Sequence, residues 1–435
     1  MNKQRRFFSL LVMAVLLGLL VAACGPAAQP TPAPTKAPAA ATPASKPTEK
    51  PAEKPAAAST VAPSKPAAKL KGTEVKIGFL APKTGPVAAW GVEHDNVVKL
   101  VESQMNASGG IGGLPVKILF YDTQGKPDEA VSLTRRLVSE DKTLIMLGPL
   151  LSSEVSVAFP IAVALKAPIL SCCSNAPGLS AQNRPWGFRL PQGADLEVGA
   201  NVKLFVKENN IKKAVMVGDQ KDAFSKLMST QYIPPIVKAA GVDLINGSEP
   251  IGFNTGDTSF AAQVTRIKDL NPDAIFAFAL PAEGGAFLKE VRRQGLKQPV
   301  LGPTAWIATQ FLDAAGDSAE GVRLSAVWDV DYPKAKDFVE SYKKAYGKDP
   351  TMAGAYAYDS LYIVKKIIEA GEVTNDPADL AKDWERIKNG LENVKYEGVA
   401  GKSAFDKNGD GIHTTYQATV KGGKFVTMYD KILTD

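Results

Sequence analysis

The sequence predicts an α/β protein built from two doubly wound lobes. Short apolar strands alternate with amphipathic helices of about 12–18 residues. The alternation runs through more elements than one parallel sheet comfortably holds, and a chain of 435 residues is long enough for two or three domains. Hydrophobic residues make up 45% and charged residues 22% of the chain, as in ordinary globular proteins.

Two series of strands and helices carry this prediction. The first comprises strand 75–80, helix 88–107, strand 116–121, helix 127–140, strand 144–147, helix 153–164 and strand 168–170. The second comprises strand 214–217, helix 222–239, strand 242–245, helix 257–269, strand 274–278, helix 283–294 and strand 299–301. Continuous apolar strands of this kind are typical of parallel sheets covered by helices on both faces. Two lobes of similar build follow from the two series.

Residues 1–23 are predicted to be a lipoprotein signal peptide. Three basic residues lie within the first six positions, the run 7–21 is apolar, and Ala22 and Ala23 stand before Cys24. An apolar run of 15 residues is short for a membrane span. The junction resembles the bacterial lipobox, in which the cysteine is acylated, so Cys24 is the predicted lipidation site. The alternative is a plain secretory signal in which Cys24 has no role.

A disordered linker is predicted for residues 24–71. Residues 25–69 consist almost wholly of Ala, Pro, Lys, Thr and Ser and hold 11 of the 31 prolines. Such a segment buries too little apolar surface to offset its conformational entropy. It is expected to be an extended tether between a lipid anchor and the folded part.

The distribution of charge excludes nucleic acid as a partner. The net charge is +6, but residues 1–71 hold ten Lys and Arg against two Glu, a net +8. The remaining residues therefore carry a net charge of −2. A mildly acidic folded part has no electrostatic footprint for phosphates.

Few residues are available for metal or nucleophile chemistry. The chain has two histidines, His94 and His413, and its only cysteines besides Cys24 are the adjacent Cys172 and Cys173. A bridge between neighbours would be strained, so both are expected to be free thiols. So few His and Cys leave almost nothing for a His/Cys zinc cluster, neither His lies in a recognisable nucleophile motif, and the sequence has no P-loop. We therefore expect no enzyme activity, no metal and no cofactor.

An ordered series of motifs resembles one family. The motifs are Lys83-Thr-Gly-Pro-Val-Ala-Ala-Trp-Gly91, Asn106-Ala-Ser-Gly-Gly-Ile-Gly-Gly-Leu114, Tyr121-Asp122 before Asp128-Glu-Ala130, Leu147-Gly-Pro-Leu-Leu-Ser-Ser153 and Phe188-Arg189-Leu190. In order and spacing they resemble the branched-chain amino acid (Leu/Ile/Val)-binding proteins of bacterial ABC importers. The resemblance covers nearly all of residues 72–435. It implies a type I periplasmic-binding-protein fold: two α/β lobes, joined by a three-strand hinge, that close on a ligand in the cleft.

The resemblance also implies how the chain is divided and what it works with. Lobe 1 would take 72–192 plus 330–412, and lobe 2 would take 193–329 plus 413–435. The implied function is extracytoplasmic capture of a small amino acid-like, carboxylate or amide ligand by a monomer. Its partners would be an ABC permease with its ATPase subunits, and the membrane through the lipid anchor. The alternative is a sensor that presents a metabolite to a membrane receptor, and an exported enzyme is disfavoured because His is scarce.

Polar turns after the strands of the first lobe are the candidate ligand contacts. The segment 149–153 follows a strand and opens a helix, so Ser152 or Ser153 would either cap the helix or contact a ligand carboxylate. The family match favours a ligand contact for Ser152, with Leu151 beside it. In the turn 172–177, the resemblance places Cys173, Ser174 and Asn175 at positions that contact the ligand's polar end.

The remaining candidates rest on the same resemblance. Trp90 matches an aromatic that packs on the ligand, Phe224 matches an aromatic of the second lobe, and Leu280 is aliphatic at a second aromatic position. Thr304 stands where amino-acid binders commonly place a Glu that pairs with the ligand's ammonium. Transport of amino acids is therefore in question, unless a carboxylate elsewhere supplies the charge; the candidates are Asp219, Asp329 and Asp331.

The segment Asp406-Lys-Asn-Gly-Asp-Gly411 has two interpretations. It matches the first half of a calcium loop, but the twelfth position is Gln417 where such loops have a bidentate Glu. Its Asn-Gly and Asp-Gly pairs are equally typical of a turn before a strand over 416–420. The missing bidentate ligand favours the turn.

Overall fold

A five-stranded parallel sheet forms the centre of the first lobe. The computed structural model describes residues 70–434, so the signal peptide, Cys24 and nearly all of the predicted linker lie outside the described residues. The strands are β1 (Val75–Ala81), β2 (Val116–Asp122), β3 (Met146–Leu147), β4 (Ile169–Ser171) and β5 (Gly187–Arg189). Their order is β2-β1-β3-β4-β5. Strand β1 is buried at six of its seven positions, as its nearly unbroken apolar sequence predicts.

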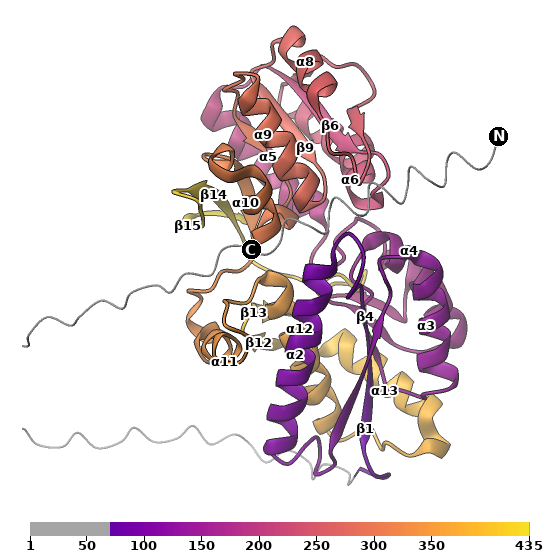
Figure 1. The fold of residues 1–435 in the computed structure, drawn as a ribbon. Helices are drawn as coiled ribbons and strands as arrows, with labels where there is room; N and C mark the ends of the chain where they lie inside the picture. Colours follow the sequence, from indigo (N-terminus) through magenta and orange to yellow (C-terminus); the bar gives the residue numbers. More distant parts are fainter. Residues whose placement is uncertain (1–69, 435) are drawn as a thin grey trace, which may run out of the picture. The chain divides into compact units, whose positions relative to one another are not determined.

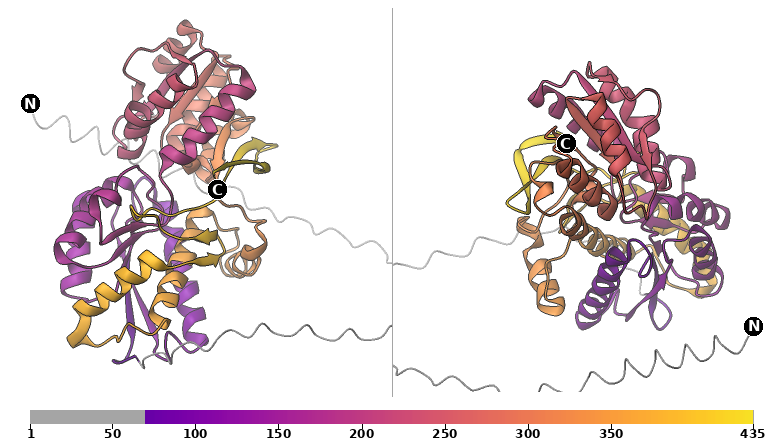
Figure 2. Two further views of the ribbon diagram at one scale, coloured as in Figure 1. Left: turned by 180° about the vertical axis from the view of Figure 1, so that it is seen from behind. Right: turned by 45° about the horizontal axis from the view of Figure 1, so that its top comes forward.

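Helices cover both faces of this sheet. They are α2 (Ala88–Ala107), α3 (Pro127–Ser139), α4 (Ser152–Leu165), α11 (Lys336–Tyr346), α12 (Met352–Glu369) and α13 (Leu380–Asn393). Helices α2, α11, α12 and α13 share one hydrophobic core with the sheet, and α3 and α4 pack on the other face. Figure 2 shows α13, in gold, beside the first sheet, although it comes after the parallel strands of the second sheet in the sequence. The β12 (Tyr396–Gly398) and β13 (Gly401–Ser403) strands form a separate small pair.

The second lobe is built around a larger sheet of mixed direction. Its strands are β6 (Lys213–Asp219), β7 (Asp243–Leu244), β8 (Ile251–Phe253), β9 (Ala274–Phe278), β10 (Val300–Leu301), β11 (Arg323–Ala326), β14 (Thr415–Lys421) and β15 (Lys424–Thr434). Strands β6 to β11 pair in parallel, whereas β14 and β15 add an antiparallel hairpin beside β11. Figure 1 shows this hairpin, in yellow, at the side of the second lobe.

Helices again lie on both faces of the second sheet. They are α5 (Ala194–Asn209), α6 (Ala223–Leu227), α7 (Ile233–Ala239), α8 (Ala261–Leu270), α9 (Pro281–Arg293) and α10 (Thr309–Ala315). Helices α5 to α7 pack on one face and α8 to α10 on the other. Among all helices of residues 70–434, none combines the length and hydropathy needed to cross a membrane. The predicted α/β fold of two doubly wound lobes is confirmed.

Two predicted helices differ from the observed ones. The helix predicted over 222–239 is divided into α6 and α7 by a π-helical turn, Met228–Tyr232. Pro234 and Pro235 follow this turn and lack the N–H groups that regular α-helical bonds need. The helix predicted from residue 257 begins at Ala261, because Asp257 instead closes a turn by accepting the N–H of Asn254 at 2.9 Å.

The chain passes between the lobes three times, and a buried ion pair joins two of the crossings. The crossings follow β5, β11 and β13. Arg189, which is fully buried at the end of β5, donates from Nε to Asp410 Oδ1 at 2.6 Å and from Nη2 to Asp410 Oδ2 at 2.8 Å. Its Nη1 donates to the carbonyl of Ala176. The first and third crossings are therefore held together by a bidentate pair.

The carboxylates of the segment 406–411 are bonded to protein donors. Asp406 Oδ1 accepts the N–H groups of Asn408 at 2.8 Å and Asp410 at 2.9 Å, while both oxygens of Asp410 bond to Arg189. Phe405 and Gly411 form an antiparallel bridge across the segment. This arrangement is a tight turn, in which the oxygens that a calcium ion would use face hydrogen-bond donors.

Replacing Arg189 is expected to destabilise the protein strongly. Arg189→Met leaves the Asp410 carboxylate without its partner, and a broken buried pair costs about 3–5 kcal/mol. The free energy of unfolding, measured by urea denaturation, checks this. The control is Lys343→Ala, which breaks the exposed Lys343–Asp349 pair and should cost less than about 1 kcal/mol. Equal losses in the two variants would contradict the structural role of Arg189.

Calcium and chelators are expected to leave the stability unchanged. The Asp406 and Asp410 oxygens already accept hydrogen bonds, so a cation gains little by displacing them. The melting temperature should be the same in millimolar calcium and in excess EDTA. A drop of several degrees in EDTA would revive the calcium-loop interpretation.

Candidate functional site

A cavity lies between the two lobes, where the carboxyl ends of strands from both sheets meet. It holds an empty volume of about 660 Å³, which includes space open to solvent. Its walls come from turns after β1, β3 and β4 of the first lobe, after β6, β9 and β10 of the second, and from the start of α12. Ligands of open α/β sheets bind at such strand ends.

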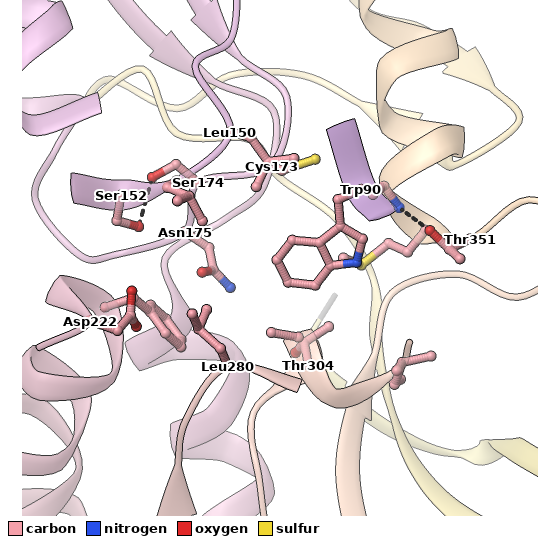
Figure 3. A pocket seen from close by; sticks show the side chains of 16 residues that line it. Trp90, Leu150, Ser152, Cys173, Ser174, Asn175, Asp222, Leu280, Thr304 and Thr351 are labelled. Atoms are coloured by element: carbon pink, nitrogen blue, oxygen red, sulfur yellow. Dashed lines mark hydrogen bonds between the residues drawn. The ribbon is translucent and has the colours of Figure 1, made fainter. Parts of the chain in front are cut away.

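All nine residues predicted to contact a ligand line this cavity (Figure 3). They are Trp90, Leu151, Ser152, Cys173, Ser174, Asn175, Phe224, Leu280 and Thr304. Their contact with a ligand stays a prediction. The rest of the lining was not named from the sequence: Leu150, Asp222, Ala305, Ile307, Thr351, Met352 and Ala353. Of these, Leu150, Ala305 and Ile307 adjoin predicted positions, whereas the residues at the start of α12 reach the cavity only through tertiary packing.

Hydroxyl groups join the two turns of the first-lobe wall. The Ser152 and Ser174 hydroxyls are 2.9 Å apart, and the Ser174 N–H donates to Ser171 Oγ at 3.2 Å. Ser171 in turn donates to the carbonyl of Pro149 at 2.8 Å. The N-cap of α4 is Leu151, so Ser152 does not cap the helix, and the capping alternative is wrong for this residue. Its hydroxyl instead forms part of the cavity wall, at the N-terminus of α4, which is the positive end of the helix dipole.

Asn175 supplies the free polar group of this wall. Its side chain points into the cavity in Figure 3, and within residues 70–434 no hydrogen bond occupies its amide. Its backbone carbonyl is held by the N–H of Ala194 at 3.0 Å. An amide positioned in this way can donate to a carboxylate or accept from an N–H group.

Cys172, Cys173 and His94 form a buried cluster beside the cavity. Both cysteines are free thiols, as predicted, and the ligand atoms of all three side chains lie within 4.8 Å of one another. His94 Nε2 lies 3.2 Å from the carbonyl of Ala353, which can only accept, so this nitrogen carries the proton. Burial lowers the pKa of His94 to about 4 and raises that of Cys173. At neutral pH the His94 imidazole is therefore neutral and the Cys173 thiol is protonated, and a protonated thiol is a poor nucleophile.

The opposite wall is largely apolar. Leu280 of the second lobe lies across the cavity from Trp90 of the first (Figure 3), and Phe224 of the second lobe also lines the cavity. The one carboxylate in the lining, Asp222, caps α6: its Oδ2 accepts from Ser225 N at 2.8 Å and from Ser225 Oγ at 2.7 Å. Within the described part of the chain, residues 70–434, no Lys or Arg lines the cavity. An apolar body with one polar end would therefore match both walls.

The three carboxylates proposed to replace the missing Glu do not line the cavity. Asp219 is buried and accepts N–H groups from its own turn, including Lys221 at 2.8 Å. Asp329 bonds to the hydroxyl of Tyr429, in a separate surface pocket near the hinge. Asp331 lies beside Asp329 and is exposed. The expectation that one of them supplies the charge is not met.

A buried carboxyl that the sequence did not indicate lies behind Thr304. Glu197, near the start of α5, is 2% exposed and shares a hydrogen bond with the Thr304 hydroxyl. Burial raises the pKa of Glu197 to about 8, Arg189 partly offsets the rise, and Asp195 adds to it. The side chain is therefore mostly protonated at neutral pH. Only the pairing of α5 with the turn after β10 brings the two residues together.

Known proteins that resemble this chain in sequence or in fold include solute-binding proteins. The Leu/Ile/Val-binding protein of Citrobacter freundii is 25% identical over 338 residues, covering 78% of this chain and 88% of the relative. The substrate-binding protein LivJ of Streptococcus pneumoniae has a TM-score of 0.71 at 23% identity, covering 82% and 100% of the two chains. A solute-binding protein of an R. palustris ABC transporter has a TM-score of 0.72 at 21% identity, covering 83% and 97%.

The family is shown by a match over most of the chain. The family model described as periplasmic binding protein matches residues 74–424, and the motif resemblance to Leu/Ile/Val-binding proteins is confirmed. The two-lobed fold, the cavity between the lobes and the sequence match all point to the same family. The chain belongs to the periplasmic binding protein family.

Proposed function

We propose that this chain is the solute-binding protein of an ABC importer and captures a small carboxylate or amide by closure of its lobes. The observation that carries the proposal is the interlobe cavity, with a hydroxyl-rich wall on one lobe and an apolar wall on the other. The chain would act as a non-enzymatic carrier. The neutral His94 and protonated Cys173 beside the cavity are consistent with binding without chemistry.

The polar end of the ligand is assigned to the first lobe. Ser152, Ser174 and Asn175 offer hydroxyl and amide groups, and α4 directs the positive end of its dipole toward the same place. A carboxylate is the group that such donors favour. The apolar part of the ligand would then lie between Trp90 and Phe224, which the second lobe would bring over it on closure.

The ligand class depends on whether the ligand carries an ammonium group besides its carboxylate. The S. pneumoniae neighbour was solved with isoleucine and the R. palustris neighbour with benzoate, so this fold accepts ligands with and without an ammonium group. Here Thr304 offers a hydroxyl where an ammonium would need a carboxylate, and Asp222, the carboxylate of the lining, has its Oδ2 bonded to Ser225. These contacts favour a ligand without an ammonium, such as an aromatic or aliphatic carboxylate.

The proposed setting is the outer face of the cytoplasmic membrane. Lipidation at Cys24 would anchor the chain, and residues 24–71 would tether the lobes within reach of a permease and its ATPase subunits. We propose that the carrier is a monomer, since one chain supplies both walls of the cavity.

Thermal stabilisation by a ligand panel tests the function. Aromatic carboxylates such as benzoate should raise the melting temperature more than isoleucine or leucine, and a ligand at 100 times its dissociation constant adds about 2.7 kcal/mol of stability. Stabilisation by amino acids alone would contradict the ammonium-free class, and no stabilisation by any member would contradict the function.

Ser152→Ala should weaken the binding of the stabilising ligand by about 1–2 kcal/mol, because it removes a hydroxyl from the polar wall. The matched control is Ser153→Ala, since Ser153 is the next residue of α4 but does not line the cavity. Dissociation constants from calorimetry provide the comparison. Equal affinities of the two variants would place the carboxylate elsewhere.

Cys24→Ala should release the protein from the membrane fraction. The substitution removes the only atom to which the anchor is expected to be attached. Fractionation and intact-mass measurement of the wild-type chain check this. Retention of the variant in the membrane, with no lipid mass on wild-type Cys24, would favour the plain secretory signal.

A further inference from the structure

The Thr304 hydroxyl lies between the Glu197 carboxyl and the cavity, so it can form hydrogen bonds with Glu197 and with a ligand. It lines the cavity, yet it is 3% exposed and shares a hydrogen bond with the Glu197 carboxyl. A hydroxyl has one proton to donate. If that proton goes to an ionised Glu197, the oxygen offers only lone pairs to the cavity. If Glu197 is protonated and donates to Thr304, the hydroxyl proton is free to point into the cavity.

The groups around Glu197 explain why the protonated form prevails near neutral pH. Arg189 of β5 is the nearby cation, but its Nε and Nη2 are bonded to Asp410 and its Nη1 to the Ala176 carbonyl. Asp195 of α5 repels an ionised Glu197. Besides burial, the charge of Glu197 also raises the pKa of Tyr356 of α12. Glu197 therefore has a buried position and no cation bonded to it.

We propose that Glu197, acting through the Thr304 hydroxyl, selects the polar group that the second lobe accepts from the ligand. When a protonated Glu197 donates its own proton to the Thr304 oxygen, the Thr304 hydroxyl donates into the cavity, which then accepts a carbonyl, hydroxyl or carboxylate oxygen at this point and rejects an ammonium. With an ionised Glu197, Thr304 accepts, and the preference reverses. Glu197 is thus a positioning residue for specificity. The inference rests on the proposed function, because it assigns a ligand class to the same cavity.

Titration calorimetry from pH 6 to 9.5, with benzoate and isoleucine as probes, tests this. The wild-type affinity for benzoate should be constant below pH 7 and fall toward tenfold per pH unit above the pKa of about 8. Near pH 8, benzoate binding should take up about half a proton, measured in buffers of different ionisation enthalpy. Isoleucine should bind at least tenfold more weakly than benzoate at pH 6 and gain affinity as the pH rises.

Three variants separate the selecting role from a structural one. Glu197→Gln keeps the shape and a donor, so it should bind benzoate as the wild type does at pH 7, without pH dependence or proton uptake. Thr304→Val should weaken benzoate binding at pH 7 and also remove the pH dependence. The matched control is Asp359→Asn: Asp359 is buried with a pKa raised to about 7, but it accepts from Val399 and Ala400 and does not line the cavity. This variant should retain the wild-type pH profile.

The possible results separate this inference from the function on which it rests. A Glu197→Gln profile parallel to that of the wild type would overturn the role of Glu197 and leave the binding function standing. Isoleucine binding more tightly than benzoate at pH 6 would also overturn it. Failure of the wild type and Glu197→Gln to bind either probe at any pH would overturn the ligand class and this inference together.

Discussion

The buried pair between Arg189 and Asp410 is the contact on which the arrangement of the lobes depends. Arg189 ends the last strand of the first sheet, and Asp410 belongs to the segment that returns the chain to the second sheet. A fully buried guanidinium is costly unless every donor is used. Here Asp410 and the Ala176 carbonyl engage Nε and both terminal nitrogens. Two crossings far apart in the sequence must therefore lie together before the charge is satisfied.

The sequence was a good guide to elements with a strong local pattern. Strand β1 is apolar throughout, and α3 has a clear amphipathic face, so both were predicted closely. Helix α12 was not predicted: 12 of its 18 residues are buried, and its first 12 residues contain a single charged side chain, Asp359, so little in the sequence reveals a helical period there. The division of the helix after β6 depends on Pro234 and Pro235, and the late start of α8 depends on the turn closed by Asp257.

The candidate site was predictable where it follows strand ends and unpredictable where it depends on packing. Ser152 and Ser174 lie in turns after adjacent strands, so the topology brings them together, and their hydroxyls are 2.9 Å apart. Glu197 lies more than 100 positions from Thr304 and within a helix that no motif marked. Nothing local to either residue indicates the contact. The acidic residues that the sequence does suggest are bonded elsewhere or exposed: Asp219 accepts N–H groups of its own turn, Asp329 bonds to Tyr429, and Asp331 is exposed.

Arg189 interacts both with Asp410 at the hinge and, through its charge, with Glu197 beside the cavity. The positive charge of Arg189 favours ionisation of Glu197, but its hydrogen bonds go to Asp410 and Ala176, so the attraction does not outweigh the cost of burial. Were Arg189 released from Asp410, its charge would be drawn to Glu197, and an ionised Glu197 would turn the Thr304 hydroxyl from a donor into an acceptor toward the cavity. Arg189 therefore takes part in both arrangements: it joins the first and third crossings through Asp410, and its charge only partly offsets the effect of burial on the pKa of Glu197.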